Sequence, residues 1–216
     1  MICPSRQIAK IRSSEVAKLF RHLATSLFRC GILVFVITFL GCDGTVTPKP
    51  RGYFRIDVPQ HQYRAFDSTY PFLFDVPVYA VILADTSSLA EPGFMNVLWP
   101  DFNAQLHVSY KKVDGNLAMY IDDAFTLVNK HIPKASAISQ QEYINSENKV
   151  FGLTYEIRGA DAASPYQFYL TDSTHHFLRG ALYFNLVPNN DSLQPVIEFL
   201  KEDVQHIIST LRWKKS

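Results

Sequence analysis

One short stretch of the chain gathers side chains of the kind that hydrolases use. Residues 172–176 are Asp-Ser-Thr-His-His, an acid, two hydroxyls and two imidazoles in succession. A hydrolase needs a nucleophile and a base in contact, and imidazoles also ligate metals. In an extended chain, however, neighbouring side chains point to opposite faces, so His175 and His176 do not converge on one metal. Because Asp and Ser side chains also bond nearby backbone amides, a tight turn is the favoured interpretation over a catalytic or metal site.

The other ionisable candidates have structural explanations as well. His107 lies on the outward face of an alternating segment, where contact with solvent is expected. His131 follows a helical segment, and a cationic imidazole suits the negative end of a helix. Asp122 and Asp123 diverge by about 100° on a helix and do not form an acid–base pair. Since the G-x-S-x-G, P-loop, G-x-G-x-x-G and H-E-x-x-H motifs are also missing, we predict no catalytic residue, no metal and no cofactor.

Cys42 is the residue with the clearest chemistry. Residues 32–40 form an uncharged, mostly apolar run that is followed directly by Gly41 and Cys42. A membrane-spanning helix needs roughly 20 apolar residues, so this run is too short to span a bilayer but fits the core of a secretory signal. A small residue followed by Cys resembles a bacterial lipobox, in which the thiol receives lipid such as palmitate and the leader is cut before the Cys. The alternative is a short buried apolar strand followed by an ordinary cysteine.

The charge distribution supports a lipoprotein signal peptide over residues 1–41. These residues carry six basic side chains and one acidic side chain, whereas the rest carries 15 basic and 19 acidic ones. A basic head before a mildly acidic body is typical of a targeting segment. The net charge of the whole chain is only +1, which argues against a nucleic-acid partner. Cys3 and Cys30 lie in the leader, so acylation of Cys42 leaves a domain without free thiols, which suits an oxidising envelope compartment.

Residues 42–52 are expected to form the lipidated cysteine and an extended tether. Pro48 and Pro50 favour extended geometry, and Gly44 and Gly52 add conformational freedom. Such a tether holds a domain away from a membrane surface. Residues 53–216 contain no repeats or low-complexity stretches, and we predict a single α+β domain.

The elements of this domain follow from the spacing of its apolar residues. Alternating or short apolar runs predict strands over residues 53–58, 72–74, 80–84, 104–111, 137–144, 150–158, 166–171 and 177–185. The strand over 177–185 is apolar on both faces apart from Arg179 and is therefore expected at the centre of a sheet. Helical spacing predicts helices over 117–128 and from Asp191 or Ser192 to Leu211.

The order of strands, helix, antiparallel strands and C-terminal helix predicts a mostly antiparallel sheet with two helices. By analogy of fold alone, this α+β order looks like the PsbP/Mog1-type α-β-α sandwich, with a cystatin-like or other α+β sheet as the alternative. Residues 93–100 are dense in Phe, Met and Trp. Core packing is the favoured interpretation of this segment, and a partner-binding patch is the alternative.

Several long, colinear strings resemble the gliding-motility lipoprotein family GldD of the Bacteroidetes. The strings occupy residues 48–55, 95–96, 102–104, 106–111, 170–174, 177–185 and 191–192. The resemblance implies a cell-envelope lipoprotein required for gliding motility and linked to the type IX secretion machinery. It implies no catalytic residue and gives a role to Cys42 alone, as the lipid attachment site.

The sequence supports three functional hypotheses, in decreasing order. The first is a non-enzymatic, lipid-anchored, periplasm-facing component whose partners are the membrane and other gliding and secretion proteins. The second is a lipid-anchored module that binds a small molecule between sheet and helix, and the third is an envelope hydrolase using Asp172, Ser173 and His176. Asp43 after the cysteine favours retention at the inner membrane in some bacteria, and the choice between inner and outer membrane stays open.

Overall fold

The computed structural model describes residues 21, 25, 56–87 and 91–214. The chain divides into two compact units, residues 1–51 and 52–216, and in the first only Arg21 and Thr25 are described, both within a helix. The other predicted signal-peptide residues, Cys42 and the tether over 42–52 lie outside the described residues. Among the described helices, none combines the length and apolar character needed to cross a membrane.

The second unit is organised around a seven-stranded antiparallel sheet with the order β3-β4-β5-β9-β8-β7-β6. Its strands are β3 (Val81–Ala84), β4 (Met95–Trp99), β5 (Ala104–Lys112), β6 (Ala137–Asn145), β7 (Val150–Arg158), β8 (Tyr166–Thr171) and β9 (His176–Phe184). The β9 strand occupies the middle of the sheet, which confirms the prediction made from its apolar character on both faces. Arg179 is the exception in β9 and is only partly buried.

A second, three-stranded sheet has the order β1-β2-β10. It consists of β1 (Tyr63–Asp67), β2 (Phe72–Pro77) and β10 (Arg212–Trp213), so it joins the two ends of the domain. The predicted strand over 53–58 is wrong in its described part, because residues 56–58 are exposed and outside any strand. The chain enters the sheet only at Tyr63, after the proline at position 59, which cannot donate a ladder hydrogen bond.

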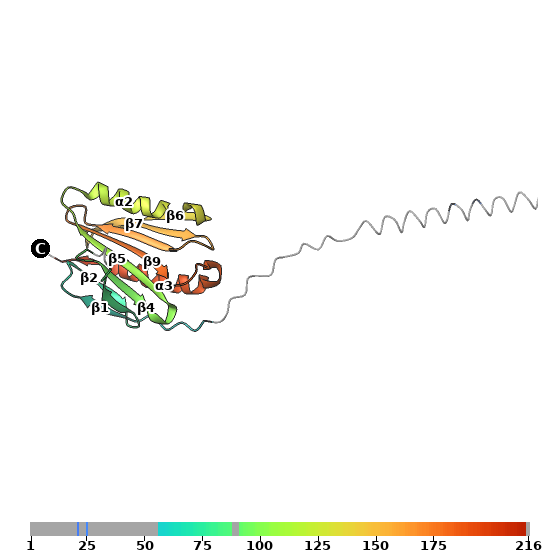
Figure 1. Ribbon diagram of the computed structural model, residues 1–216, viewed down its shortest axis with the longest axis horizontal. Helices are drawn as coiled ribbons and strands as arrows, with labels where there is room; N and C mark the ends of the chain where they lie inside the picture. Colours follow the sequence, from blue (N-terminus) through green and yellow to red (C-terminus); the bar gives the residue numbers. More distant parts are fainter. Residues whose placement is uncertain (1–20, 22–24, 26–55, 88–90, 215–216) are drawn as a thin grey trace, which may run out of the picture. The chain divides into compact units, whose positions relative to one another are not determined.

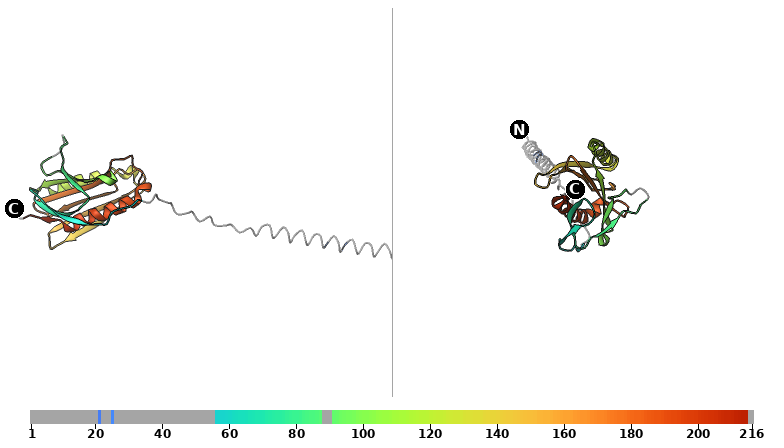
Figure 2. Two further views of the ribbon diagram at one scale, coloured as in Figure 1. Left: turned by 90° about the horizontal axis from the view of Figure 1, so that it is seen from below. Right: turned by 90° about the vertical axis from the view of Figure 1, so that its left-hand side faces the viewer.

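The two longer helices cover opposite faces of the large sheet (Figures 1 and 2). One face carries α2 (Leu117–Asn129), followed by a short 3₁₀ turn, η2 (Ile132–Lys134); another 3₁₀ turn, η1 (Pro100–Phe102), links β4 and β5. The other face carries α3 (Asn190–Thr210) together with the small sheet, against which α3 packs at β2. The predicted α+β class, with mostly antiparallel strands and two helices, is confirmed.

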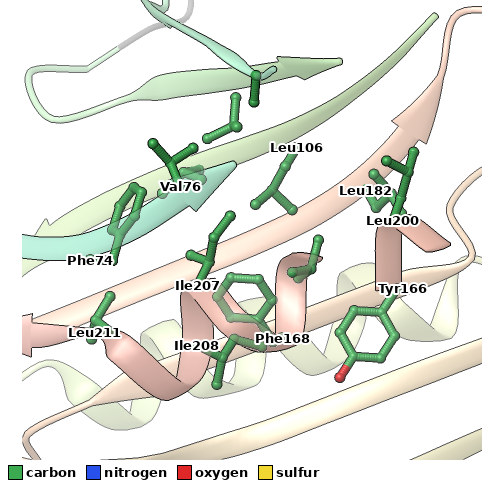
Figure 3. Packing of buried hydrophobic residues seen from close by; sticks show 14 of the residues in the cluster. Phe74, Val76, Leu106, Tyr166, Phe168, Leu182, Leu200, Ile207, Ile208 and Leu211 are labelled. Atoms are coloured by element: carbon green, nitrogen blue, oxygen red, sulfur yellow. The ribbon is translucent and has the colours of Figure 1, made fainter. Parts of the chain in front are cut away.

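The larger core lies between α3, the small sheet and the large sheet (Figure 3). The predicted stripe of α3 is buried throughout and comprises Val196, Phe199, Leu200, Val204, Ile207, Ile208 and Leu211. Each large apolar side chain buried in this way contributes about 1.5–3 kcal/mol, so α3 is an integral part of the domain. The helix begins earlier than the predicted Asp191 or Ser192, because Asn190 Nδ2 donates to the carbonyls of Gly159 and Ala162, both at 2.8 Å.

Gly180, in the middle of β9, makes room for an aromatic ring of this core. A Cβ atom at this position would lie 2.2 Å from Cε1 of Phe168 on the neighbouring strand. Phe168 is 1% exposed, and its side chain lies on the face of the sheet that packs against α3, as Figure 3 shows. The ring and the glycine therefore fit one another, and any larger residue at position 180 must displace the ring.

Candidate functional site

The hydrolase-like residues 172–176 form a closed turn between β8 and β9. The Asp172 carboxylate accepts hydrogen bonds from the backbone N–H groups of Thr174 at 3.0 Å and of His175 and His176 at 2.8 Å. Burial of the carboxyl raises the pKa of Asp172, but the hydrogen bonds from these N–H groups together have the larger, opposite effect and lower the pKa to about 2. Ser173 has a φ of 69°, a value suited to a turn. The predicted turn is confirmed.

The side chains of this turn do not have the geometry of a catalytic triad. The Thr174 hydroxyl donates to Asp172 Oδ2 at 2.9 Å, so its proton points toward the acid. His175 uses a single atom, Nδ1, to approach both Thr174 Oγ1 at 2.9 Å and Asp172 Oδ2 at 3.7 Å. A relay needs one ring nitrogen on the acid and the other on the nucleophile, and this arrangement does not supply it.

The two adjacent histidines have different surroundings, although their ring centroids lie only 6.3 Å apart. The His175 side chain is 70% exposed, whereas His176 is buried and stacks on Trp213 with ring centroids 4.9 Å apart. His176 Nδ1 lies 2.8 Å from the Tyr110 hydroxyl. In the described part of the chain, no cluster of three His, Cys, Asp or Glu residues is arranged to hold a metal ion.

A pocket of about 320 Å³ lies beside α2, where the helix leaves part of the large sheet uncovered. Its apolar wall is formed by Phe94, Tyr120, Ala124, Leu127 and Phe177. Its polar groups come from the loop after β3 and from β4, β5, β9 and α2, and comprise Asp85, Asn96, His107, Ser109, Lys111, Asp123 and Arg179. The sequence hypothesis of a ligand site between sheet and helix therefore has a cavity of suitable composition.

His107 lies in this pocket and is half-buried, so its side chain contacts other residues at the surface of the domain. The helix α2 and the loop after β3 contribute other groups to the same pocket over the outward face of β5. His107 Nδ1 lies 2.6 Å from Asn96 Oδ1, and its Nε2 lies 3.1 Å from Gln105 Nε2. Burial lowers the pKa of His107, and the charge of Arg179 lowers it further against the opposing effect of Asp85.

Arg179 enters the same pocket from β9, the central strand. Its Nη2 donates to Gln167 Oε1 at 2.6 Å, while its Nε is buried without a hydrogen-bond partner. Burial lowers the pKa of the guanidinium, with the Tyr183 hydroxyl acting in the opposite direction, but an arginine side chain keeps its charge at neutral pH. The pocket therefore holds a fixed positive charge with unused donor capacity.

The partner of Arg179, Gln167, is almost fully buried and also contacts His131 beyond the end of α2. The Nε2 atoms of Gln167 and His131 are 2.9 Å apart. Burial, followed by the charge of Arg179, lowers the pKa of His131. The predicted role of His131 as a cation at the helix end is therefore wrong, because its surroundings favour the neutral imidazole.

The two aspartates of α2 separate as predicted. Asp123 lines the pocket beside β4, β5 and β9, whereas Asp122 lines a shallow hollow on the side of β6 and β7. In the segment 93–100, Met95 and Trp99 are buried in the larger core, which confirms core packing for these residues. Phe94 instead faces the pocket.

A second polar cluster, which the sequence reasoning missed, surrounds Asp203 of α3. The Asp203 side chain is 0% exposed, and Trp99 Nε1 donates to its Oδ2 at 3.0 Å. The Tyr79 hydroxyl lies 2.9 Å from both carboxylate oxygens, the Tyr63 hydroxyl donates to Oδ1 at 3.1 Å, and His61 Nδ1 lies 2.8 Å from Oδ1. The Asp203 cluster thus connects the first residues of the domain, at His61 and Tyr63, to α3.

The surroundings of the Asp203 cluster keep its two tyrosine hydroxyls protonated. Burial, supported by the hydrogen bond and charge of Asp203, raises the pKa of both Tyr63 and Tyr79. Sequence offered one signal, since position 203 lies next to Val204 and between Leu200 and Ile207 on the buried side of the helix. A carboxylate in an apolar stripe is buried only when it is hydrogen-bonded.

The comparison with protein families decides what kind of protein carries these features. A family model described as gliding motility lipoprotein GldD matches residues 43–213. The chain belongs to this family. The GldD-family match covers every strand and helix of the second unit, including the pocket and the Asp203 cluster.

Comparison with individual proteins adds less about this GldD-family member. No curated protein matches the chain. Among solved structures, the chain is similar to the solution structure of cyanobacterial PsbP (CyanoP) from Synechocystis sp. PCC 6803. The TM-score is 0.45 at 10% identity, over 74% of this chain and 97% of that chain.

Proposed function

We propose that this GldD-family lipoprotein is a non-enzymatic component of the cell envelope, anchored through Cys42 and facing the periplasm. In this role it docks to other proteins of the gliding machinery and of the linked type IX secretion machinery. The observation that carries the proposal is the family match, which begins at residue 43, directly after Cys42. Residues 1–41 then act as the leader that is cut before the lipidated cysteine.

The turn over residues 172–176 supports a role without catalysis. Asp172 accepts hydrogen bonds from three backbone N–H groups and from the Thr174 hydroxyl. Nδ1 of His176, the hypothesised base, lies 2.8 Å from the Tyr110 hydroxyl, which is outside the turn. A nucleophile in this arrangement has no base to accept its proton. The residues that looked most reactive in the sequence therefore serve the hairpin between β8 and β9.

The outer surface of α2 and η2 supports docking to another protein. Met119, Phe125 and Ile132 are between 48% and 58% exposed along this surface. Phe125 and Ile132 border the same hollow, and exposed apolar side chains that lie together are typical of interaction sites. We expect a partner envelope protein to cover them.

Two experiments in intact cells test this role. Cys42→Ser is expected to release the protein from membranes, because the thiol that receives lipid is gone. A photo-crosslinker at Phe125 is expected to capture gliding or secretion proteins, whereas one at the exposed Gln205 of α3 is not. Continued membrane association of the serine variant, or equal capture from both positions, contradicts the proposal.

A second candidate function is the binding of a small molecule, and the pocket beside α2 favours it. The pocket combines an apolar wall with a few convergent polar groups, which is the usual composition of ligand sites. A saturable shift of the unfolding temperature by a metabolite is the expected result. Binding and docking are compatible in one lipoprotein.

A further inference from the structure

The charge of Arg179 is unpaired within the described structure. Its guanidinium forms no salt bridge with a described carboxylate, and its hydrogen bonds go to the neutral side chains of Gln167 and Tyr183. The Nε atom is buried without any partner. Burying part of an arginine without an anion costs stability, so a fold that retains it at the centre of its sheet has a use for that charge.

Among the described residues, none of the groups around Arg179 forms a salt bridge with it. The two imidazoles near it, His107 and His131, are held toward their neutral forms by burial and by Arg179 itself. The carboxylates of Asp85 and Asp123 line the same pocket without pairing with Arg179, and Lys111 is paired with Glu91. The Arg179 guanidinium therefore faces the pocket without a directly bound anion.

The apolar wall next to this charge is aromatic. Phe94, Tyr120 and Phe177 line the pocket, and Lys111 Nζ lies 5.5 Å from the ring centroid of Phe94 and 5.8 Å from that of Tyr120. The volume of about 320 Å³ lies at the lower end of the range of about 300–1,000 Å³ that is usual for ligand sites. The pocket thus fits a small molecule with an apolar body and one polar end.

We propose that the pocket binds a small organic carboxylate, with its carboxylate on Arg179 and its apolar body against Phe94, Tyr120 and Phe177. This inference rests on the second candidate function, ligand binding beside α2, and is independent of the docking role. A single free guanidinium matches the single charge of a carboxylate. A phosphate dianion fits less well, because its two negative charges exceed the single charge of the guanidinium.

Two sources supply this chemistry: a free carboxylic acid, or the C-terminal residue of a peptide. The probes are 3-phenylpropionate and N-acetyl-alanyl-phenylalanine, each compared with its neutral amide. Isothermal titration uses the full chain in lipid nanodiscs, with empty nanodiscs as the blank. We expect saturable binding of at least one acid and binding of its amide that is weaker by roughly tenfold or more, since a hydrogen bond to a charged group is lost.

Variants locate the site. Arg179→Gln is expected to weaken acid binding by roughly tenfold or more, whereas Arg64→Gln, at an exposed arginine of β1, leaves it unchanged. The Arg179→Gln chain is expected to unfold at the temperature of the wild type or above it, because an unpaired cation is gone. If it does not fold, Ser109→Phe carries the test, because it fills the pocket from β5 and keeps Arg179.

The outcomes separate the inference from the functions beneath it. Equal binding of acid and amide overturns the carboxylate assignment and leaves ligand binding standing. Full binding by Arg179→Gln or by Ser109→Phe overturns the location, and no binding of either acid overturns the inference itself. None of these results affects the crosslinking at Phe125, so failure of the docking role is recognised separately.

Discussion

Replacing Asp203 by Asn is expected to destabilise the domain far more than the loss of one surface charge. The substitution keeps the shape of the side chain but turns one carboxylate oxygen into an N–H donor. Three groups then face an N–H donor or a weaker acceptor: Trp99 Nε1, which can only donate, and the hydroxyls of Tyr79 and Tyr63. Because Trp99 is 1% exposed, water does not replace the lost acceptor there.

The magnitude follows from the bonds that are lost. A hydrogen bond to a charged group contributes about 1.5–3 kcal/mol net, so losing two of those around Asp203 reduces the free energy of unfolding by about 3 kcal/mol or more. For a domain of this size, each kcal/mol lowers the midpoint of thermal unfolding by about 2–4 °C, which gives a decrease of roughly 6–12 °C. Urea denaturation at neutral pH measures the first quantity, and differential scanning calorimetry the second.

The matched control is Glu202→Gln, the neighbouring residue of α3. Its carboxylate lies 3.0 Å from His61 Nε2, but its side chain is 65% exposed, and a surface ion pair contributes about 1 kcal/mol at most. In a Trp99→Phe background, which lacks the indole donor, Asp203→Asn is expected to cost less than in the wild type. An Asp203→Asn chain as stable as the wild type, or strictly additive effects with Trp99→Phe, would refute a cooperative buried network.

Three further perturbations test other parts of the fold. Asp172→Asn is expected to lower the free energy of unfolding by about 2 kcal/mol at pH 7, because the folded pKa of Asp172 lies below the unfolded value of about 3.9. The contribution of Asp172 is full above pH ~4 and is lost as the pH falls to about 2. A difference between variant and wild type that is the same at pH 2 and pH 7 in urea titrations would contradict this. Gly180→Ala is expected to cost about 1–3 kcal/mol through the clash with the Phe168 ring, and adding Phe168→Leu should cost less than the two single losses combined in denaturant melts. Leu200→Ala, inside the larger core, is expected to cost about 2–5 kcal/mol, whereas Met119→Ala on the exposed side of α2 stays within about 0.5 kcal/mol; similar values for both would show that burial does not set their contribution.

Most strands of the large sheet could be predicted because their signals are local, whereas β4 was not predicted as a strand. The segment 150–158 alternates and forms β7 over the same residues, and the apolar run that includes Leu178 and Leu182 forms the central strand. The buried stripe of α3 was also evident, since its spacing repeats over several turns. In each case, neighbouring residues in the sequence carried the information.

The small sheet and the two polar sites depend on contacts that are distant in sequence. β10 has only two residues and pairs with β2, whose residues lie far away in the chain. The Asp203 cluster brings groups from two loops and two strands onto one carboxylate of a helix, and no local pattern brings them together. Arg179 was recognised as the one charge in an apolar strand. That its guanidinium lacks a salt bridge depends on how much of the sheet α2 covers, which no local pattern indicates.

The position of His61 and Tyr63 on Asp203 bears on how this lipoprotein carries mechanical load. In the proposed role, a tension between the membrane anchor and a docked partner reaches the domain along the segment before β1. His61 and Tyr63 transmit this tension to the middle of α3, because both contact the Asp203 carboxylate and the two contacts share the load. Without these contacts, the force would act on β1 first and separate it from β2 one residue pair after another.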